Sequence, residues 1–292
     1  MALRIWFLAI MCALSVATRA SRASLPAVGD QATEAPFTLE GGSIVMRMTV
    51  KGKGSFKVLL ATAAPVSKFS FDALKAMGLQ INYTSAGEVN PDKYILFTSV
   101  PDVQIGTLKL SHIGVVLNDL SGVSRRLGVS VDGVLGYNFL KDRVVQIDYE
   151  KGVVRFLPKS PSAQPGVKVA VVALDRDQDE PSTVIEDVLV EDKRFKALID
   201  TTQEGTLALT PAAVKLLGQI APDPKSPPRE GSVRELKIGG LARGSTRAVF
   251  FGKGAGLDHS LKKYGVIIGN GLMEKFIVTL DYRKNVVTLV ER

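Results

Sequence analysis

Two short stretches of this chain decide its fold. Residues 56–63 read FKVLLATA, and residues 195–202 read FKALIDTT. In both, an apolar run typical of a buried β-strand ends in a tight turn. The stretches differ at their sixth position, where the second has the carboxylate of Asp200 and the first has the methyl group of Ala61. The sequence therefore repeats a strand and a turn but places only one acid there.

The similarity continues beyond these turns in a constant register. A Gly that follows two apolar residues, an Asp before Tyr, and a Gly after Ile each occur twice, which indicates an internal duplication. The matched pairs are Gly136 with Gly269, Asp148 with Asp281, and Gly106 with Gly239, each 133 residues apart (269 − 136, 281 − 148 and 239 − 106).

Size and composition agree with two folded lobes. The chain has 292 residues, of which 46% are hydrophobic and 23% are charged, as in ordinary globular proteins. The formal net charge is +8, but the Lys and Arg residues are scattered and no aromatic residues alternate with them. We therefore expect no nucleic-acid partner.

The first residues have the pattern of a secretory signal peptide. Arg4 precedes an apolar run over residues 5–17, and small residues suited to cleavage follow up to residue 23. The run is shorter than the roughly 20 residues of a membrane-spanning helix. We expect residues 1–23 to be removed and the protein to be secreted or periplasmic, with a retained N-terminal anchor as the alternative. No later stretch is long enough to span a bilayer, and Cys12 would leave with the signal, so neither thiol chemistry nor disulfides are expected.

Short β-branched and apolar runs between turn residues predict a mostly β protein with few helices. We expect one lobe over residues 24–158, an exposed linker rich in Pro and Ser over 159–166, and a second lobe over 167–292. The expected strands are 43–50, 56–60, 114–117, 144–149, 153–157, 167–174, 184–190, 277–282 and 286–290. The expected helices are 71–77, 137–141, 210–218 and 270–275.

The order of motifs resembles that of the bilobal pepsin-like and retropepsin-like aspartic peptidases. The chain has, twice, an apolar strand, a turn like Asp-Thr-Gly, a short helix, an apolar-apolar-Gly motif and a strand ending in Asp-Tyr, from about Phe37 onward. The resemblance implies an all-β, two-lobed double β-barrel in which each lobe supplies one aspartate to a shared centre. It places Asp200 as the second-lobe acid and Ala61 where the first-lobe acid should be. It also implies that the hydroxyls of Thr62 and Thr201 hydrogen-bond to the opposite turn and lock the lobes together.

Loss of one acid predicts impaired catalysis. Two neighbouring carboxylates share a proton, so that one acts as base toward water and the other as acid toward the substrate carbonyl. The glycine that the family has in each turn is replaced here by Ala63 and Thr202, which predicts crowding. Asp72 and Glu204 do not occupy positions that face the opposite turn, so we expect neither to replace the missing acid. Asp200 itself then has the simpler role of a turn carboxylate that accepts backbone N–H groups.

The preferred hypothesis is an exported, monomeric, catalytically impaired protein that binds a peptide or unfolded protein segment between its lobes. A flap over this site is expected within residues 83–101, which include Tyr83 and Tyr94. The alternatives are an active aspartic endopeptidase in which Asp200 works with an unidentified second acid, and a non-catalytic structural or partner-binding module.

No cofactor or metal is expected. His112 and His259 are the only histidines in the sequence, and neither has carboxylates at ligand spacing. Asn82 begins an Asn-Tyr-Thr triplet that fits the pattern of a glycosylation acceptor. Asp148 and Asp281, at strand ends, are expected to be turn residues.

Overall fold

The computed structural model describes residues 32–79, 97–161, 169–175, 182–223, 226–253 and 264–291. Several sequence predictions concern residues outside these ranges. They are the signal peptide with Cys12, the flap tyrosines Tyr83 and Tyr94, the acceptor Asn82, His259 and linker residues 162–166.

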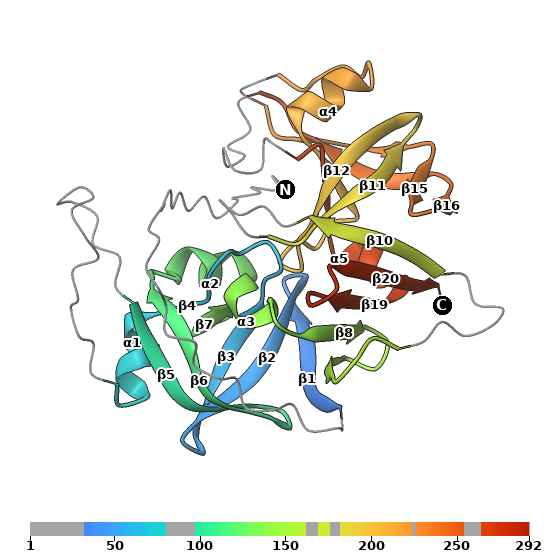
Figure 1. The fold of residues 1–292 in the computed structure, drawn as a ribbon. Coiled ribbons are helices and arrows are strands. Elements are labelled where there is room, and N and C mark those ends of the chain that lie inside the picture. The colour runs from blue at the N-terminus through green and yellow to red at the C-terminus, as the bar shows by residue number, and fades with distance from the viewer. Residues whose placement is uncertain are drawn as a thin grey trace, which may run out of the picture.

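The described chain forms two lobes built almost entirely from β-strands (Figure 1). This confirms the predicted all-β, two-lobed architecture. In the first lobe six strands close into a barrel, because the last strand of the ring pairs with the first. In ring order they are β2 (Ser43–Val50), β3 (Lys53–Leu60), β7 (Gly133–Leu135), β4 (Lys68–Phe69), β6 (Leu108–Leu117) and β5 (Phe97–Ile105). The helices of this lobe are α1 (Phe71–Ala76), α2 (Ser121–Leu127) and α3 (Tyr137–Leu140).

The second lobe repeats this arrangement but its barrel is only half closed. The strand that would correspond to β5 is divided into β14 (Arg229–Val233), which pairs with β17, and β15 (Leu236–Ile238), which pairs with β11. The other strands are β11 (Val184–Val190), β12 (Lys193–Ile199), β13 (Leu207–Leu209), β16 (Leu241–Arg243), β17 (Thr246–Phe250) and β18 (Val266–Ile268). The helices are α4 (Pro211–Leu216) and α5 (Asn270–Met273).

One antiparallel sheet joins the lobes. Its strand order is β1 (Thr33–Glu40), β9 (Val153–Leu157), β8 (Val144–Asp148), β19 (Phe276–Asp281), β20 (Val286–Glu291) and β10 (Val169–Asp175). At its centre Gln146 lies opposite Thr279, and the Gln146 amide donates to the Thr279 hydroxyl at 3.2 Å. These two residues are 133 positions apart (279 − 146), which is the spacing of the sequence repeat. The axis that relates the lobes therefore passes through this pair.

Local sequence explains the turns and helix starts. Lys51 and Gly52 have φ of 52° and 68°, so both central residues of the β2–β3 turn are left-handed, as tight hairpins require. Ser70 and Thr210 cap α1 and α4 by accepting the N–H groups of Ala73 and Ala213. The caps therefore fix where α1 and α4 begin.

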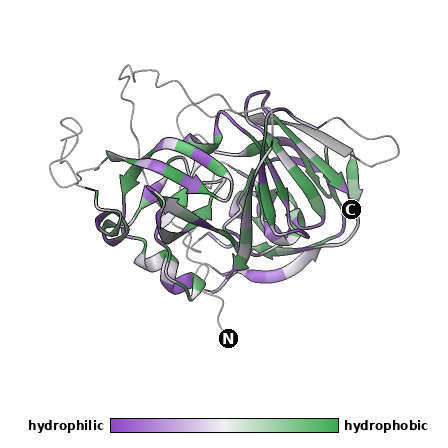
Figure 2. Ribbon diagram, turned by 90° about the horizontal axis from the view of Figure 1, so that it is seen from below, coloured by the Kyte–Doolittle hydropathy of each residue, from purple (hydrophilic) through white to green (hydrophobic). Residues whose placement is uncertain are grey.

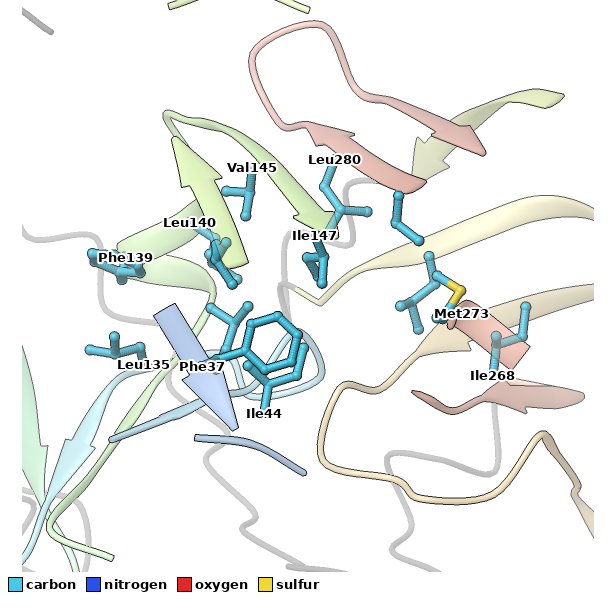
Figure 3. Close-up of a cluster of buried hydrophobic side chains, with 14 of the residues drawn as sticks. Phe37, Ile44, Leu135, Phe139, Leu140, Val145, Ile147, Ile268, Met273 and Leu280 are labelled. Atoms are coloured by element: carbon cyan, nitrogen blue, oxygen red, sulfur yellow. The ribbon is translucent and has the colours of Figure 1, made fainter. Parts of the chain in front are cut away.

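The apolar core continues from one lobe into the other. Hydrophobic residues concentrate along the strands of both lobes (Figure 2). Phe37, Ile44 and Ile147 of the first lobe belong to the same buried cluster as Met273 and Leu280 of the second (Figure 3). Burial of apolar surface therefore stabilises the junction as well as each lobe. None of the helices in the described ranges has the length and apolar character of a membrane span.

Candidate functional site between the two turns

The turns after β3 and β12 meet at the junction of the lobes. The Thr62 hydroxyl donates to the carbonyl of Ile199 at 2.6 Å and accepts the N–H of Thr201 at 3.1 Å. The Thr201 hydroxyl does the same in reverse, to the carbonyl of Leu60 at 2.6 Å and from the N–H of Thr62 at 3.1 Å. Both side chains are buried, so these four bonds tie one lobe to the other away from solvent.

Ala61 and Asp200 occupy equivalent places beside this network. The N–H of Ala61 donates to the carbonyl of Leu135 at 3.0 Å, and the N–H of Asp200 donates to that of Ile268 at 2.9 Å. Each acceptor lies in the strand that precedes a repeated glycine, so the backbone of the two turns is the same although the side chains differ. The methyl group therefore stands where the duplication would place a second carboxylate.

The carboxylate of Asp200 is nearly enclosed and is bound within its own turn. Its side chain is 7% exposed, and Oδ1 accepts both the N–H of Thr202 at 2.8 Å and the Thr202 hydroxyl at 2.7 Å. Burial raises the pKa of Asp200, and the two bonds from Thr202 and the charge of Arg126 only partly oppose this. Thr202 thus contributes a hydroxyl donor to Asp200, in addition to the bulk expected from the sequence.

Arg126 is the site residue that sequence reasoning missed. It lies in α2 of the first lobe, and its Nη1 donates to the carbonyl of Thr202 in the second lobe at 3.2 Å. Its charge acts on Asp200 across the junction. In the sequence Arg126 is one of two adjacent basic residues that read as solvated surface, and only the docking of α2 distinguishes it from Arg125.

The surroundings of Ala61 are apolar. Its cluster contains Val45, Leu59, Leu120 and Val123, all from the first lobe. Ala63, two residues further, packs against the second-lobe cluster that includes Val184. An ionised carboxylate at position 61 would need polar partners, and this cluster consists of hydrocarbon side chains.

Asp72 and Glu204 are exposed, unlike Asp200. Asp72 is exposed in the first turn of α1. Glu204 is also exposed and lies against Gly42. Among the described residues, the charged group that acts on the pKa of Asp200 is Arg126, and no second acid contributes. The two turns therefore bring together a single acid, Asp200, and α2 adds the positive charge of Arg126 beside it.

The other predicted positions form separate local structures. Asp281 accepts the N–H groups of Arg283 at 3.0 Å and Lys284 at 2.9 Å, and Asp148 accepts that of Lys151 at 3.3 Å. The ring of His112 contacts the hydroxyl of Ser111 at 3.1 Å. Within the described ranges no three His, Cys, Asp or Glu side chains are grouped as metal ligands.

Comparison with models of known protein families and with curated proteins gave no match to this chain.

Proposed function

We propose that this chain is a non-hydrolytic relative of the bilobal aspartic peptidases, exported from the cell, that binds an extended peptide or unfolded protein segment between its lobes. The observation that carries the proposal is the pairing of Asp200 with Ala61 at equivalent turns. The N–H groups of Ala61 and Asp200 donate to equivalent carbonyls, and Thr62 and Thr201 exchange matching hydrogen bonds, yet only one of the two turns has an acid.

Hydrolysis of a peptide bond needs a proton donor for the leaving nitrogen as well as a base for water. Positioned acid-base groups each contribute roughly a hundredfold to ten-thousandfold. Asp200 can fill one of these roles at a time. Burial lowers the pKa of Arg126, but a guanidinium stays protonated in proteins and so cannot exchange protons with Asp200. Cleavage at a useful rate is therefore not expected.

Binding of a peptide does not require the pair of acids that its hydrolysis requires. Ala63 and Thr202 follow the two buried threonines in the chain. Both are half-buried, so part of their surface is accessible beside the threonine hydrogen bonds. Extended peptides bind through backbone groups and do not require paired acids. The lobes are held in a fixed relation, which reduces the entropy lost when a ligand binds.

The test uses the exported form of the protein, residues 24–292. We expect no cleavage of a reduced, denatured protein substrate from acid to neutral pH, and measurable binding of peptides or of a transition-state-mimicking aspartic-peptidase inhibitor. Cleavage that is abolished in Asp200→Ala would establish the active endopeptidase instead. Failure of all peptides and the inhibitor to bind would leave the structural module.

A further inference from the structure

A series of hydrogen bonds runs from the first lobe to the carboxylate of Asp200. The hydroxyl of Tyr149, in the first-lobe Asp-Tyr motif, donates to Oδ1 of Asn270 at 2.6 Å. Nδ2 of Asn270 donates to the carbonyl of Thr201 at 2.8 Å. The N–H of that same peptide group, which belongs to Thr202, donates to Oδ1 of Asp200 at 2.8 Å. Every bond in the series therefore donates toward the acid.

The neighbours of Asn270 fix the orientation of its amide. Nδ2 also donates to the carbonyl of Gly42 in the first lobe, at 2.6 Å. Carbonyls only accept hydrogen bonds, so the NH2 group must face both carbonyls and leave Oδ1 for the hydroxyl of Tyr149. The Asn270 side chain is 3% exposed, so water competes little for these bonds. The first lobe therefore holds this second-lobe amide at both of its ends.

The peptide group between Thr201 and Thr202 couples this series to the acid. Its carbonyl accepts from Asn270 and, at 3.3 Å, from the N–H of Ile44. Donors at a carbonyl polarise the peptide group and strengthen the bond that its N–H makes. A stronger bond from the N–H of Thr202 favours the ionised carboxylate of Asp200. Burial raises the pKa of Asp200, and this N–H is one of the groups that oppose the rise.

The duplication supplies an equivalent series that ends without an acid. Tyr282, 133 positions after Tyr149 (282 − 149), has its hydroxyl 2.7 Å from that of Thr183. The hydroxyl of Thr183 donates to the carbonyl of Thr62 at 2.9 Å, so it accepts the proton of Tyr282. This second series ends in the turn of Ala61, which has a methyl group in place of a carboxylate. Of the two series, only the first leads to an acid.

We propose that Tyr149 and Asn270 are positioning residues for Asp200, which stabilise its ionised form by orienting and polarising the peptide group that binds it. The protonation of Asp200 is thereby coupled to the docking of the first lobe. Among the described residues, the charged group that acts on Asp200 from another element is Arg126 of α2, and it favours the same ionised form. Glu204 of the same turn is exposed, and α5 has no titratable side chain. The role belongs to the acid itself and does not depend on a bound peptide.

The test follows the titration of Asp200 by NMR, in protein with isotope-labelled aspartate carboxyl carbons. The Asp200 signal is the one that is absent from Asp200→Asn. In Tyr149→Phe, which loses one hydroxyl and keeps the ring, we expect Asp200 to bind its proton about twofold to tenfold more tightly than in the parent, as for one weakened hydrogen bond. Asn270→Ala, which removes the donor to the Thr201 carbonyl, should show at least as large a change.

Tyr282→Phe is the matched control, because it makes the same chemical change in the series that ends beside Ala61. It removes a buried hydroxyl contact and should lower the free energy of unfolding, as Tyr149→Phe does. It should leave the titration of Asp200 unchanged. The titration therefore separates a positioning role from a purely structural one.

Two results would overturn the proposal. A proton affinity of Asp200 that is unchanged or weaker in folded Tyr149→Phe would show that the series does not act on the acid. An equal shift in Tyr282→Phe would assign the effect to a general loosening of the junction. Both measurements are made without a peptide, so the proposed binding function can fail or hold independently of them.

Discussion

The buried threonines are the residues on which the junction depends most. Each hydroxyl of Thr62 and Thr201 donates once and accepts once across the lobes. Because both hydroxyl protons are directed at carbonyls, the contact of 3.3 Å between the two oxygens contributes no bond of its own. The stabilisation comes from the four bonds to the backbone.

Replacing Thr62 by Val tests this arrangement with almost no change of shape. The carbonyl of Ile199 and the N–H of Thr201 would then be buried without partners, at about 1–3 kcal/mol each. We expect the free energy of unfolding in urea to fall by at least about 2 kcal/mol. Thr288→Val, a half-buried strand residue whose hydroxyl makes no hydrogen bond in the described ranges, should change it little. Equal effects of the two changes would contradict the interpretation.

Asp200 gives the site a pH dependence of known sign. Burial raises the pKa of its carboxyl above that of the unfolded chain, so the folded state binds the proton more tightly. Stability from this group is therefore full below the unfolded pKa and is lost as pH rises through the folded pKa. Asp200→Asn keeps the oxygen that Thr202 binds and removes the charge, so we expect it to become more stable than the parent as pH rises through this window.

The measurement is the difference in unfolding free energy between parent and Asp200→Asn at a series of pH values. A parent that gains stability over Asp200→Asn with rising pH would show that the ionised carboxylate is favoured in the folded state.

At the scale of elements, the repeated glycines hold the short helices against the turns. A Cβ added at Gly269 would lie 2.2 Å from the carbonyl oxygen of Gly205, and one at Gly136 would lie 2.7 Å from that of Ala64. Both contacts are with backbone, which cannot move aside easily. The glycines therefore permit a close approach, and their φ values of −102° and −101° are available to any residue.

We expect Gly269→Ala to lower the free energy of unfolding by about 1–3 kcal/mol through overpacking. Gly114→Ala in β6 is the matched control, because its Cβ would meet no atom within 4 Å. Chemical denaturation of the two variants side by side provides the measurement. A Gly269→Ala protein as stable as Gly114→Ala would mean that the turn and α5 are not packed as described.

The sequence predicted best the strands that are continuous apolar runs bounded by turn residues. Strands at 43–50, 153–157 and 184–190 agree with β2, β9 and β11 at both ends, because apolar runs and turn residues coincide there. β5 was missed because Pro101 lies within it, and a proline argues against a strand. The strand expected at 114–117 is the end of the longer β6, whose earlier residues alternate between buried and exposed.

The sequence also identified some residues of the candidate site and missed another. Asp200, Ala61 and the two threonines could be found because the duplication aligns them. Arg126 could not, because α2 is a single turn or two of helix, begins at Ser121-Gly122 and has no side-chain cap. Its contact with Thr202 follows from how α2 docks between the lobes, which is a tertiary property.

On the scale of the whole molecule, the lobes share a sheet and a core. β8 pairs with β19 over Ile277–Asp281, and Ile147 and Leu280 belong to one buried cluster. Separation of the lobes would expose a strand edge and an apolar face at once. The two lobes are therefore expected to unfold in a single transition.

Cutting the chain after the first lobe tests this dependence. Residues 24–158 alone would present β8 without β19, and we expect the fragment to self-associate or aggregate. Sedimentation of the fragment beside the full chain measures the effect. A soluble monomeric fragment with the stability of the parent would show that the lobes fold independently.

The first strand has a consequence for how the protein is made. The start of β1 pairs with β9, where Thr33 lies opposite Phe156, 123 positions later (156 − 33), and its end pairs with β2. During translation, the start of β1 cannot pair until β9 has been synthesised. β8 pairs with β9 along one edge, and its other edge stays unpaired until β19 has been synthesised. Pairings between strands distant in sequence slow folding, and until they form the unpaired strand edges are prone to aggregation. The nascent chain should therefore be a client for chaperones until both lobes have been synthesised.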